Sequence, residues 1–559
     1  MSNKEISDVI ELTSKLMILH GEDETRAKIY GGTAFNLDRL EDDLFSMPEE
    51  ELMKIRGVGK SMAANILQIV ATGITTELQE LIDKTPEGVL EMFKVKGIGV
   101  KKIKTLWEEL GIDNLNELQI ACESGKIAET KGFGLKTQEK ILESLLFLRQ
   151  QSGKLRMNQA AELSAVILTE LSGIYGKVEE VGAIPRKLET IDALSFLVEG
   201  DFTNKSKLPE GFVENMKASS PFIWRGTYGE NQILIEIQFE SADTYEREKL
   251  ICNASEDHLK IVLPEGQQNF YHYVKSNIFD TSEAYYAGFG SNYILPEMRE
   301  GLSEFDWIKE NSNDDLISWD ALKGSLHNHS KYSDGKNTLK EMSEACRDLG
   351  LDYFGIADHS QTATYAGGLT AGRVVQQQAE IDEINEEMTP FKVLKGIESD
   401  ILSDGGLDYE REILATFDYV VASVHANLDM SIEKATDRIL KAVENPFTTI
   451  LGHPTGRLLL SRKGYPLDFK KIIDACAVNK VIMEINASPY RLDIDWRWIP
   501  YCLEKGVMLS INPDAHKIEG FQDMHYGVAV ARKAGLTKDM TFNAMSLDKL
   551  ESFLKSRKA

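Results

Sequence analysis

The hydrophobic pattern changes character along this chain, from helical spacing near the N-terminus to short apolar runs towards the C-terminus. Between residues 5 and 45, Ile6, Val9, Ile10, Leu12 and Leu16 recur with helical spacing. Residues at this spacing share one face of a helix. We therefore expect amphipathic helices that pack together in this region.

From residue 350 onwards, the apolar positions form short runs that are followed by histidine or acidic residues. Uninterrupted runs of this length are typical of buried parallel strands. In a parallel barrel the carboxyl ends of the strands meet at one face. The pattern therefore predicts that the polar residues after the runs converge. The runs are Tyr353–Ile356, Tyr419–Val424, Thr448–Leu451 and Val507–Ile511.

Three Gly-x-Gly segments lie between these regions, each with a hydrophobic residue between the glycines and a predicted helix directly after. Glycine lets the backbone turn tightly and approach a phosphate, and the N-terminus of the next helix offers free N–H groups. Three copies in one frame resemble helix-hairpin-helix motifs, which bind the DNA backbone without reading its sequence. The alternative is that they are only tight turns between helices. The candidate DNA-binding residues are Gly57, Gly59, Lys60, Gly97, Gly99, Lys101, Lys102, Gly132 and Gly134.

Histidines and carboxylates gather at the predicted strand ends. His327 and His329 are two residues apart, so on a strand both imidazoles point to the same face. Imidazole and carboxylate ligands together suit Zn, Mn or Fe. The candidates are too many for one ion, so we expect two or three divalent ions with Glu398 as a bridge, an arrangement suited to phosphoester hydrolysis. The candidate metal ligands are His327, His329, Asp334, His359, Glu398, His425, His453, Asp514 and His516.

Composition describes a globular chain of several domains. Its 559 residues are 42% hydrophobic and 27% charged. No apolar run approaches the ~18 residues of a membrane span, and the N-terminus has no apolar signal segment, so we expect a cytoplasmic protein that does not bind membranes. The five cysteines include no Cys-x-x-Cys pair, which argues against disulfides and thiolate zinc sites.

The net charge of −26 argues against broad, sequence-blind binding to nucleic acid, because phosphate contacts need Lys and Arg. It leaves room for local binding. The candidate ligand carboxylates contribute to the acidity, and bound cations would offset it where a substrate lies.

Residues 320–555 resemble the PHP (polymerase and histidinol phosphatase) domain, in the version at the C-terminus of bacterial family X DNA polymerases. The resemblance implies a distorted (β/α)7 barrel with three ions. It assigns His327, His329, Glu398 and Asp514 to one ion, Asp334, His359 and Glu398 to a second, and His425, His453 and His516 to the third. The segments that carry it, in family order, are Leu-His-Asn-His-Ser from Leu326, Asp334-Gly335, Ile-Ala-Asp-His ending at His359, Gly-Ile-Glu-Ser-Asp-Ile-Leu from Gly396, Gly-His-Pro-Thr-Gly-Arg from Gly452 and Pro-Asp-Ala-His ending at His516.

The preceding residues resemble the rest of the same polymerases. The likeness is clear in the segments 182–198 and 295–301, within what would be an α+β palm and thumb. We therefore expect three domains: 1–150, α-helical with helix-hairpin-helix motifs; 151–312, polymerase-like palm and thumb; and 320–559, the PHP domain. We expect a monomer.

The polymerase motifs themselves are degenerate. The family pattern Gly-Ser-x-Arg-Arg, then Glu-Thr-x-Gly-Asp-x-Asp, places two Mg-binding Asp on alternate strand positions. Here those positions are Ala193 and Ser195, and Asp192 lies one residue too early, which on a strand points to the other face. Ala183 and Pro185 replace the Ser and the first Arg, and a third carboxylate maps to Glu236. We therefore expect polymerase activity to be lost.

Other positions refine the expected chemistry. In this family a Lys after the first hairpin can act as a Schiff-base lyase nucleophile, but the matching residue here is Asn65, and an amide cannot form a Schiff base. Arg457 and Arg462 follow the ligand His453 and are candidates for clamping a phosphate during catalysis. The alternative for both arginines is surface ion pairing.

The leading hypothesis is a metal-dependent 3′→5′ exonuclease that also processes 3′ ends of DNA, of the kind used in DNA repair. An active repair polymerase with a PHP exonuclease is one alternative, and a small-molecule phosphatase of the histidinol-phosphatase type is another, because ligands alone do not choose the substrate. A non-enzymatic scaffold that binds DNA ends is a fourth, and the intact ligand positions argue against it.

Overall fold

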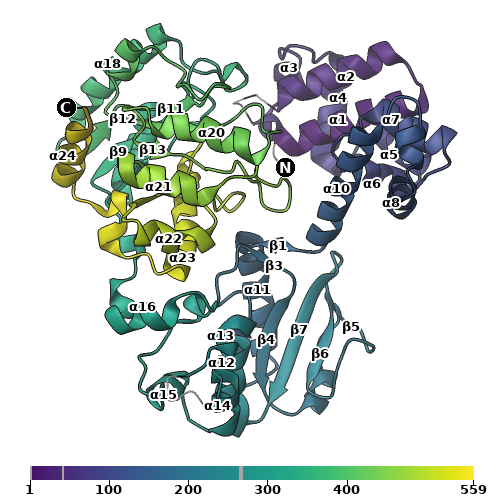
Figure 1. Ribbon diagram of the computed structural model, residues 1–559. Coiled ribbons are helices and arrows are strands. Elements are labelled where there is room, and N and C mark those ends of the chain that lie inside the picture. The colour runs from purple at the N-terminus through teal and green to yellow at the C-terminus, as the bar shows by residue number, and fades with distance from the viewer. Residues whose placement is uncertain (1–2, 39, 41–42, 264–267, 559) are drawn as a thin grey trace. The chain divides into compact units, whose positions relative to one another are not determined.

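The computed structural model describes residues 3–38, 40, 43–263 and 268–558. The chain divides into two compact units, Met1–Ser152 and Gly153–Ala559 (Figure 1). The first is helical. The second combines a mixed sheet, a group of short helices and a set of parallel strands wrapped by helices. In the described part of the chain, no helix is both long and apolar enough to cross a membrane.

The first unit begins with the amphipathic helices predicted from the spacing of apolar residues. Helix α1 (Asn3–His20) packs against α2 (Glu24–Leu37) and buries Ile6, Ile10 and Leu16. Asp23 caps α2 by accepting hydrogen bonds from the N–H groups of its first turn. The helical N-terminal region is therefore confirmed.

Three short helix pairs carry the Gly-x-Gly segments. The first glycine of each, Gly57, Gly97 and Gly132, has a φ of +92°, +92° and +93°. A side chain at such a φ is strained, so glycine is required there. The second glycine directly precedes the second helix of each pair. The pairs are α3 (Glu49–Leu52) with α4 (Lys60–Thr72), α6 (Glu87–Met92) with α7 (Val100–Lys104), and α9 (Lys126–Glu129) with α10 (Leu135–Gln151).

The remaining helices of this unit pack around the pairs. A π-helical turn at Thr105–Glu109 directly follows helix α7. The unit also contains α5 (Thr76–Asp83) and α8 (Leu115–Glu123).

The second unit opens with a five-stranded mixed sheet in the order β2-β4-β7-β6-β5. Apolar residues of α11 (Met157–Ser172) cover one face, whereas Tyr245 of α12 (Ala242–Cys252) packs on Leu197 of the other. The strands are β2 (Val178–Val181), β4 (Leu194–Glu199), β5 (Phe212–Glu214), β6 (Ile223–Tyr228) and β7 (Ile233–Glu240). A separate two-stranded antiparallel sheet pairs β1 (Leu155–Arg156) with β3 (Thr190–Ile191).

Short helices follow the sheet and enclose an aromatic core. Phe270, Tyr285 and Tyr286 are fully buried in it. The helices are α13 (Glu256–Lys260), α14 (Phe270–Ser276), α15 (Ser282–Ala287) and α16 (Glu304–Glu310).

Parallel strands fill the last part of the chain. They pair in the orders β10-β9-β8 and β11-β12-β13-β14-β15. The bridge His359↔Glu398 joins the stretch after β9 to β11, and the bridge Asn328↔Ala515 joins the stretch after β8 to the stretch after β15, so the strands form a closed circuit. The strands are β8 (Gly324–Ser325), β9 (Tyr353–Gly355), β10 (Lys392–Leu394), β11 (Gly396–Asp400), β12 (Tyr419–Ser423), β13 (Ile450–Leu451), β14 (Ile482–Asn486) and β15 (Leu509–Asn512).

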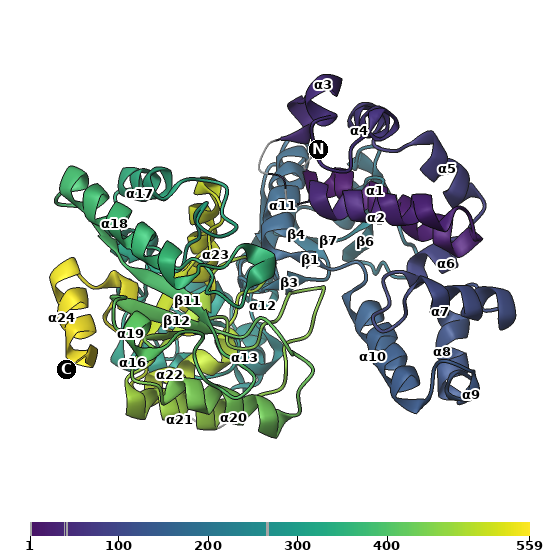
Figure 2. The same cartoon turned by 90° about the horizontal axis from the view of Figure 1, so that it is seen from above.

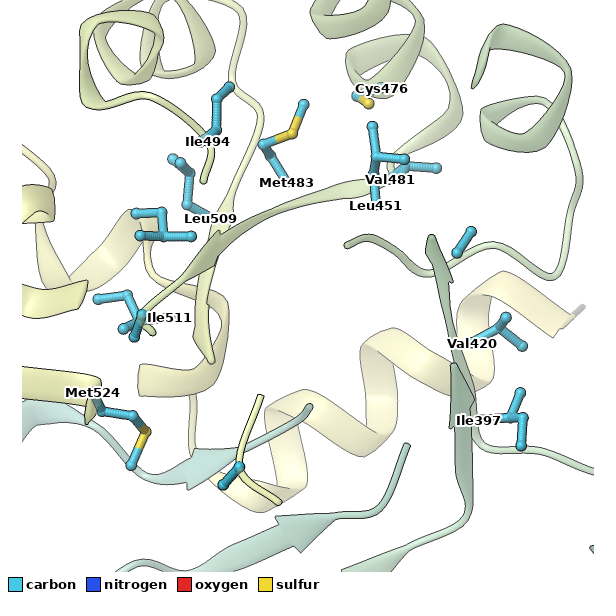
Figure 3. Close-up of a cluster of buried hydrophobic side chains, with 14 of the residues drawn as sticks. Ile397, Val420, Leu451, Cys476, Val481, Met483, Ile494, Leu509, Ile511 and Met524 are labelled. Atoms are coloured by element: carbon cyan, nitrogen blue, oxygen red, sulfur yellow. The ribbon is translucent and has the colours of Figure 1, made fainter. Parts of the chain in front are cut away.

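Helices cover the outside of this circuit. Contacts pair α17 with β9, α18 with β10 and α23 with β15. Figure 2 shows β11 and β12 between α18 on one side and α20 and α21 on the other. Ile397, Val420, Met483, Leu509 and Ile511 project into the apolar layer beneath the helices (Figure 3). The helices are α17 (Leu339–Asp348), α18 (Ala371–Met388), α19 (Arg411–Leu414), α20 (Ile432–Val443), α21 (Phe469–Asn479), α22 (Ile499–Glu504), α23 (Met524–Lys533) and α24 (Leu547–Lys558).

Two expectations about strands need correction. The first strand ends at Ser325, so His327 and His329 lie just beyond it rather than on it. They still share a side, because the bridge at Asn328 keeps this stretch extended against Ala515. The run Thr448–Leu451 yields a strand of only two residues, Ile450–Leu451.

Candidate metal centre

Glu398, on strand β11, lies at the centre of the histidine and carboxylate cluster. Its carboxylate oxygens lie 2.9 Å from His359 Nδ1, 2.9 Å from His453 Nε2, 3.2 Å from His425 Nε2 and 3.3 Å from His327 Nε2. These histidines come from four different strand ends. The parallel arrangement thus brings together residues that are far apart in the sequence, as the pattern of apolar runs predicts.

A second group lies beside the first. His329 Nε2 is 3.0 Å from Asp514 Oδ1. Asp334 Oδ1 lies 3.4 Å from His516 Nε2 and 3.6 Å from His359 Nε2. All nine predicted ligands are therefore gathered at one place.

The cluster is buried except at one side. Asp334 and His516 have side chains that are 36% and 38% exposed, whereas those of His327, His329 and Glu398 are at most 1% exposed. The cluster is therefore open to solvent on the side of Asp334 and His516.

The grouping of ligands differs from the one that the family resemblance implies. His516 gathers with His329, Asp334 and His359, and not with His425 and His453. The ring centroids of His516 and His329 are 4.1 Å apart. The groups whose ligand atoms lie within 4.8 Å of one another are His329, Asp334, His359 and His516; His327, His453 and Asp514; His327, His329 and Glu398; and His359, Glu398 and His425.

The chemistry of these donors fits divalent cations. Several buried donor atoms have no hydrogen-bond partner within the described residues, among them His327 Nε2, His329 Nδ1, His359 Nδ1 and Glu398 Oε2. Unpartnered buried polar atoms are costly, and converging on a shared ion removes that cost. Imidazole and carboxylate donors without thiolate match Zn, Mn or Fe.

Burial and mutual charge shift the pKa values of the cluster in opposite directions. Burial lowers the pKa of His329 to about 3, and the neighbouring His516 and His359 add to this effect. Burial also acts to lower the pKa of His425, but Glu398 and Asp400 outweigh it and raise the pKa to about 10. Without a cation, the carboxylates therefore favour protonation of His425, and cation binding would release that proton.

A layer of carboxylates behind the cluster orients the histidines. Glu484, fully buried on β14, lies 2.7 Å from His327 Nδ1 and accepts hydrogen bonds from the N–H of His453 and from Asn512 Nδ2. Asp400 lies 2.5 Å from His425 Nδ1. Such partners fix the tautomer and direction of a ligand ring. Sequence reasoning did not assign these roles, although Asp400 is two residues from Glu398 and Glu484 follows another apolar run.

The backbone is strained at two of the candidate ligands. His453 has a φ of +21° and Asp514 a φ of +56°, values that residues other than glycine seldom adopt. Gly335 permits a close approach as well, since a Cβ there would lie 2.6 Å from the backbone of His329. Strain held by surrounding structure is a common feature of functional sites.

Comparison with known proteins identifies the family of this chain. Family models match the chain as a PHP domain over residues 325–488, a helix-hairpin-helix domain over 1–74 and a SAM-like helix-hairpin-helix tandem over 89–145. The DNA polymerase/3′-5′ exonuclease PolX of Bacillus subtilis is 33% identical over 577 residues, covering 99% of this chain and 100% of the relative. The chain belongs to the PolX family.

The PHP part is also similar to smaller proteins. A probable phosphatase of Thermoanaerobacter sp. is 26% identical over 40% of this chain and 89% of the relative. A probable phosphatase of Clostridium acetobutylicum is 27% identical over 34% of this chain and 78% of the relative. The PHP domain is metal-dependent as a family, and the candidate ligands other than Asp514 and His516 lie within the matched residues.

Two of the positions compared above with the Mg-binding carboxylates of family X polymerases lie on neighbouring strands. Ser195 on β4 lies in register with Glu236 on β7, so the family's carboxylate positions do meet. Glu236, however, accepts a hydrogen bond from Arg225 Nε at 2.5 Å. Asp192 points elsewhere, with a side chain that is 74% exposed and 3.1 Å from Lys154.

Other predicted residues are used in different ways. Asn65 donates a hydrogen bond to Tyr30 Oη at 2.8 Å. Arg457 donates to Asp495 at 2.8 Å and to the backbone oxygens of Arg491 and Leu492, so its guanidinium faces protein groups rather than the cluster. We therefore correct the expectation that Arg457 clamps a phosphate directly. Arg462 donates to the carbonyl oxygen of Gly456 from both Nε and Nη2.

Proposed function

We propose that this PolX protein is a metal-dependent phosphodiesterase that shortens DNA from the 3′ end through its PHP domain, and that it has lost polymerase activity. The observation that carries the proposal is the gathering of nine ligand residues around Glu398 in a chain that also contains helix-hairpin-helix domains. We take the closed circuit of strands to be the distorted (β/α)7 barrel of PHP domains.

The nine residues would hold two or three ions of Mn, Zn or Fe. Bound ions supply an activated water and neutralise the charge of the phosphodiester. Glu398, close to four histidines, is placed to be shared between ions. Glu484 and Asp400 hold the rings of His327 and His425 in position. Asp334 and His516 form the open edge where the scissile phosphate arrives.

Two observations support the loss of polymerase activity. Ala193 and Ser195 lack carboxylates where two-metal nucleotidyl transfer needs them. The third carboxylate, Glu236, is paired with Arg225, so its charge is compensated within the protein. We propose that residues 151–312 remain as a palm and thumb that help to hold DNA.

DNA is the substrate that the whole chain favours. The first glycines of the three Gly-x-Gly turns share nearly one φ, and each turn leads directly into a helix whose N-terminus is available to a phosphate. Lys60, Lys101 and Lys102 add positive charge at these turns in a protein whose net charge is −26. The proposed contacts are to the DNA backbone, with the PHP site acting on an end.

Incubation of the purified protein with Mn²⁺ and a 5′-labelled single-stranded oligonucleotide tests the proposal. We expect a ladder of products shortened from the 3′ end, and no products with His329→Ala, whose imidazole lies 3.0 Å from Asp514. A wild-type protein without any product would overturn the proposal.

A small-molecule phosphatase is the second candidate, favoured by the likeness of the PHP part to the probable phosphatases. Release of phosphate from histidinol phosphate distinguishes it. If the protein hydrolyses that monoester rapidly and leaves the oligonucleotide intact, the phosphatase is favoured. The residues upstream of the PHP domain would then play no part in selecting the substrate.

A further inference from the structure

The arginines beside the metal cluster fall into two kinds. Arg457 and Arg497 form ion pairs with Asp495 at 2.8 and 2.9 Å, and Arg497 also pairs with Glu189. Arg491 has a different environment: within the described residues, its acidic contact is the candidate ligand Asp514, whose Oδ2 lies 3.6 Å from Arg491 Nε. The guanidinium group of Arg491 therefore lies at the edge of the cluster, beside Asp514.

Arg462 reinforces this positive edge. Burial and the nearby charge of Arg491 both lower the pKa of Arg462. No carboxylate pairs with Arg462 in the part of the chain that the structure describes. The segment of Arg462 is joined to that of Arg491, because the N–H of Leu459 donates a hydrogen bond to the carbonyl oxygen of Tyr490. Two guanidinium groups on joined segments, without a shared carboxylate, form a natural site for a phosphate.

Tyr490, which directly precedes Arg491 in the sequence, adds an aromatic surface. The side chain of Tyr490 is 53% exposed, although tyrosine usually buries much of its ring. The guanidinium carbon of Arg156 lies 4.1 Å from the centre of this ring, and Arg156 Nε is buried without a hydrogen-bond partner among the described residues. Proteins bind single-stranded nucleic acid with this combination of side chains: an exposed aromatic ring, an arginine stacked on it and a second arginine beside it.

The two loops that carry these side chains are fixed to each other. The N–H of Leu459 donates to the carbonyl oxygen of Tyr490 at 2.6 Å. Arg457 donates to the carbonyl oxygens of Arg491 and Leu492. Arg457 is therefore a positioning residue, which holds the turn so that Tyr490 and Arg491 stand beside the cluster.

We propose that Tyr490, Arg491, Arg462 and Arg156 form a binding site for the single-stranded 3′ segment of DNA next to the metal centre. A base stacks on Tyr490, a backbone phosphate lies between Arg462 and Arg491, and Arg156 supports the tyrosine ring and contacts the neighbouring phosphate. This inference rests on the proposed exonuclease function and names the form of DNA that its site accepts.

The test compares a tetranucleotide, which reaches the proposed base-binding surface, with bis(p-nitrophenyl) phosphate, which presents only a diester. Stacking of one base contributes roughly a 5- to 100-fold preference. We expect Tyr490→Ala to lower kcat/KM for the tetranucleotide about tenfold more than for the small diester, mainly through KM. Tyr490→Phe keeps the ring and should restore most of the loss.

Binding provides a readout that does not need turnover. Fluorescence anisotropy of a labelled tetranucleotide in EDTA should show weaker binding for Tyr490→Ala, and Arg156→Gln should flatten the dependence of log Kd on log salt. Tyr271→Ala is the matched control, because Tyr271 is 38% exposed on the distant helix α14 and should change neither quantity.

The outcomes separate the two proposals. If the wild-type protein hydrolyses neither substrate, the exonuclease function itself fails. If the wild-type protein shortens the tetranucleotide, and Tyr490→Ala has the same KM and the same binding affinity as the wild type, only the single-strand site is overturned. An equal loss on both substrates would also overturn it, since that result describes a structural role for Tyr490.

Discussion

At the scale of single residues, Glu398 and Glu484 divide the work of the metal centre. Glu398 faces the histidines that would hold the cations. Glu484 lies behind His327, 2.7 Å from its Nδ1, and accepts a hydrogen bond from the backbone N–H of His453. The two carboxylates are of one type but have different roles, because one has an oxygen without a hydrogen-bond partner and the other is fully engaged.

Replacing Glu484 tests this division. Glu484→Gln keeps the volume but removes the charge that orients His327. Loss of such a partner lowers metal affinity by roughly 10- to 100-fold. Titration of Mn²⁺ or Zn²⁺ against a competing chelator measures the affinity. An unchanged affinity would mean that Glu484 is only a packing group.

Arg457 gives a second prediction at this scale. Its guanidinium is committed to Asp495 and to two carbonyl oxygens, so Arg457→Lys should loosen the turn that carries Arg491. We expect a rise in KM for an oligonucleotide of several-fold, with kcat nearly unchanged, in steady-state assays. A loss confined to kcat would instead favour direct contact with the reacting phosphate.

At the scale of elements, the helix pairs of the first unit depend on where each glycine lies in the turn. Gly97 has a φ of +92°, while Gly99 has a φ of −96° at the extended position before α7. The same frame recurs at Gly57 and Gly59, where φ is +92° and −91°. Only the first glycine of these two pairs occupies a conformation that L-residues avoid.

A pair of substitutions distinguishes the two glycines. Gly97→Ala should lower the local free energy of unfolding by about 1–2 kcal/mol. Gly99→Ser should be nearly neutral, because serine suits the position before a helix and a Cβ there meets no atom within 4 Å. Hydrogen–deuterium exchange of peptides covering residues 87–110 reports both values. Equal effects would show that backbone conformation does not decide these positions.

Elements also set what the sequence can predict. The ligands follow apolar runs, and parallel strands deliver them to one place, so their gathering was predictable. The grouping of His516 with Asp334 was not, because it depends on how separate loops meet. The pairing of Arg457 with Asp495, 38 residues further on, likewise comes only from the folded chain. The presence of Ala193 and Ser195 at the positions where Asp is expected could be read from the sequence, but the pairing of Glu236 with Arg225 could not.

At the scale of the whole molecule, the remnant of the polymerase motif connects to the PHP part inside the second unit. Lys533 of α23 is buried and donates from Nζ to the carbonyl oxygen of Arg186 at 2.8 Å, beside Glu300. Trp496 Nε1 donates to Glu189 at 3.0 Å. Arg186 and Glu189 belong to the segment 182–198, which resembles family X polymerases, so this segment contributes to internal packing.

The buried lysine makes the stability of this contact depend on pH. Burial lowers the pKa of Lys533 to about 8 from 10.5, although Glu300 opposes the shift. Between these values the unfolded chain binds more protons than the folded one, so the free energy of unfolding rises with pH. We expect the wild type to gain about 2 kcal/mol over Lys533→Met between about pH 7.5 and 9.5. Urea unfolding at the two pH values measures it. A constant difference would contradict the shift.

The central claim is that a nuclease site works on a polymerase scaffold that no longer polymerises. A 5′-labelled primer annealed to a longer template, incubated with Mn²⁺ and with or without all four dNTPs, tests it most directly. We expect the primer to be shortened under both conditions, and His329→Ala to abolish the shortening. Extension of the primer when dNTPs are present would contradict the conclusion drawn from Ala193, Ser195 and the Arg225–Glu236 pair.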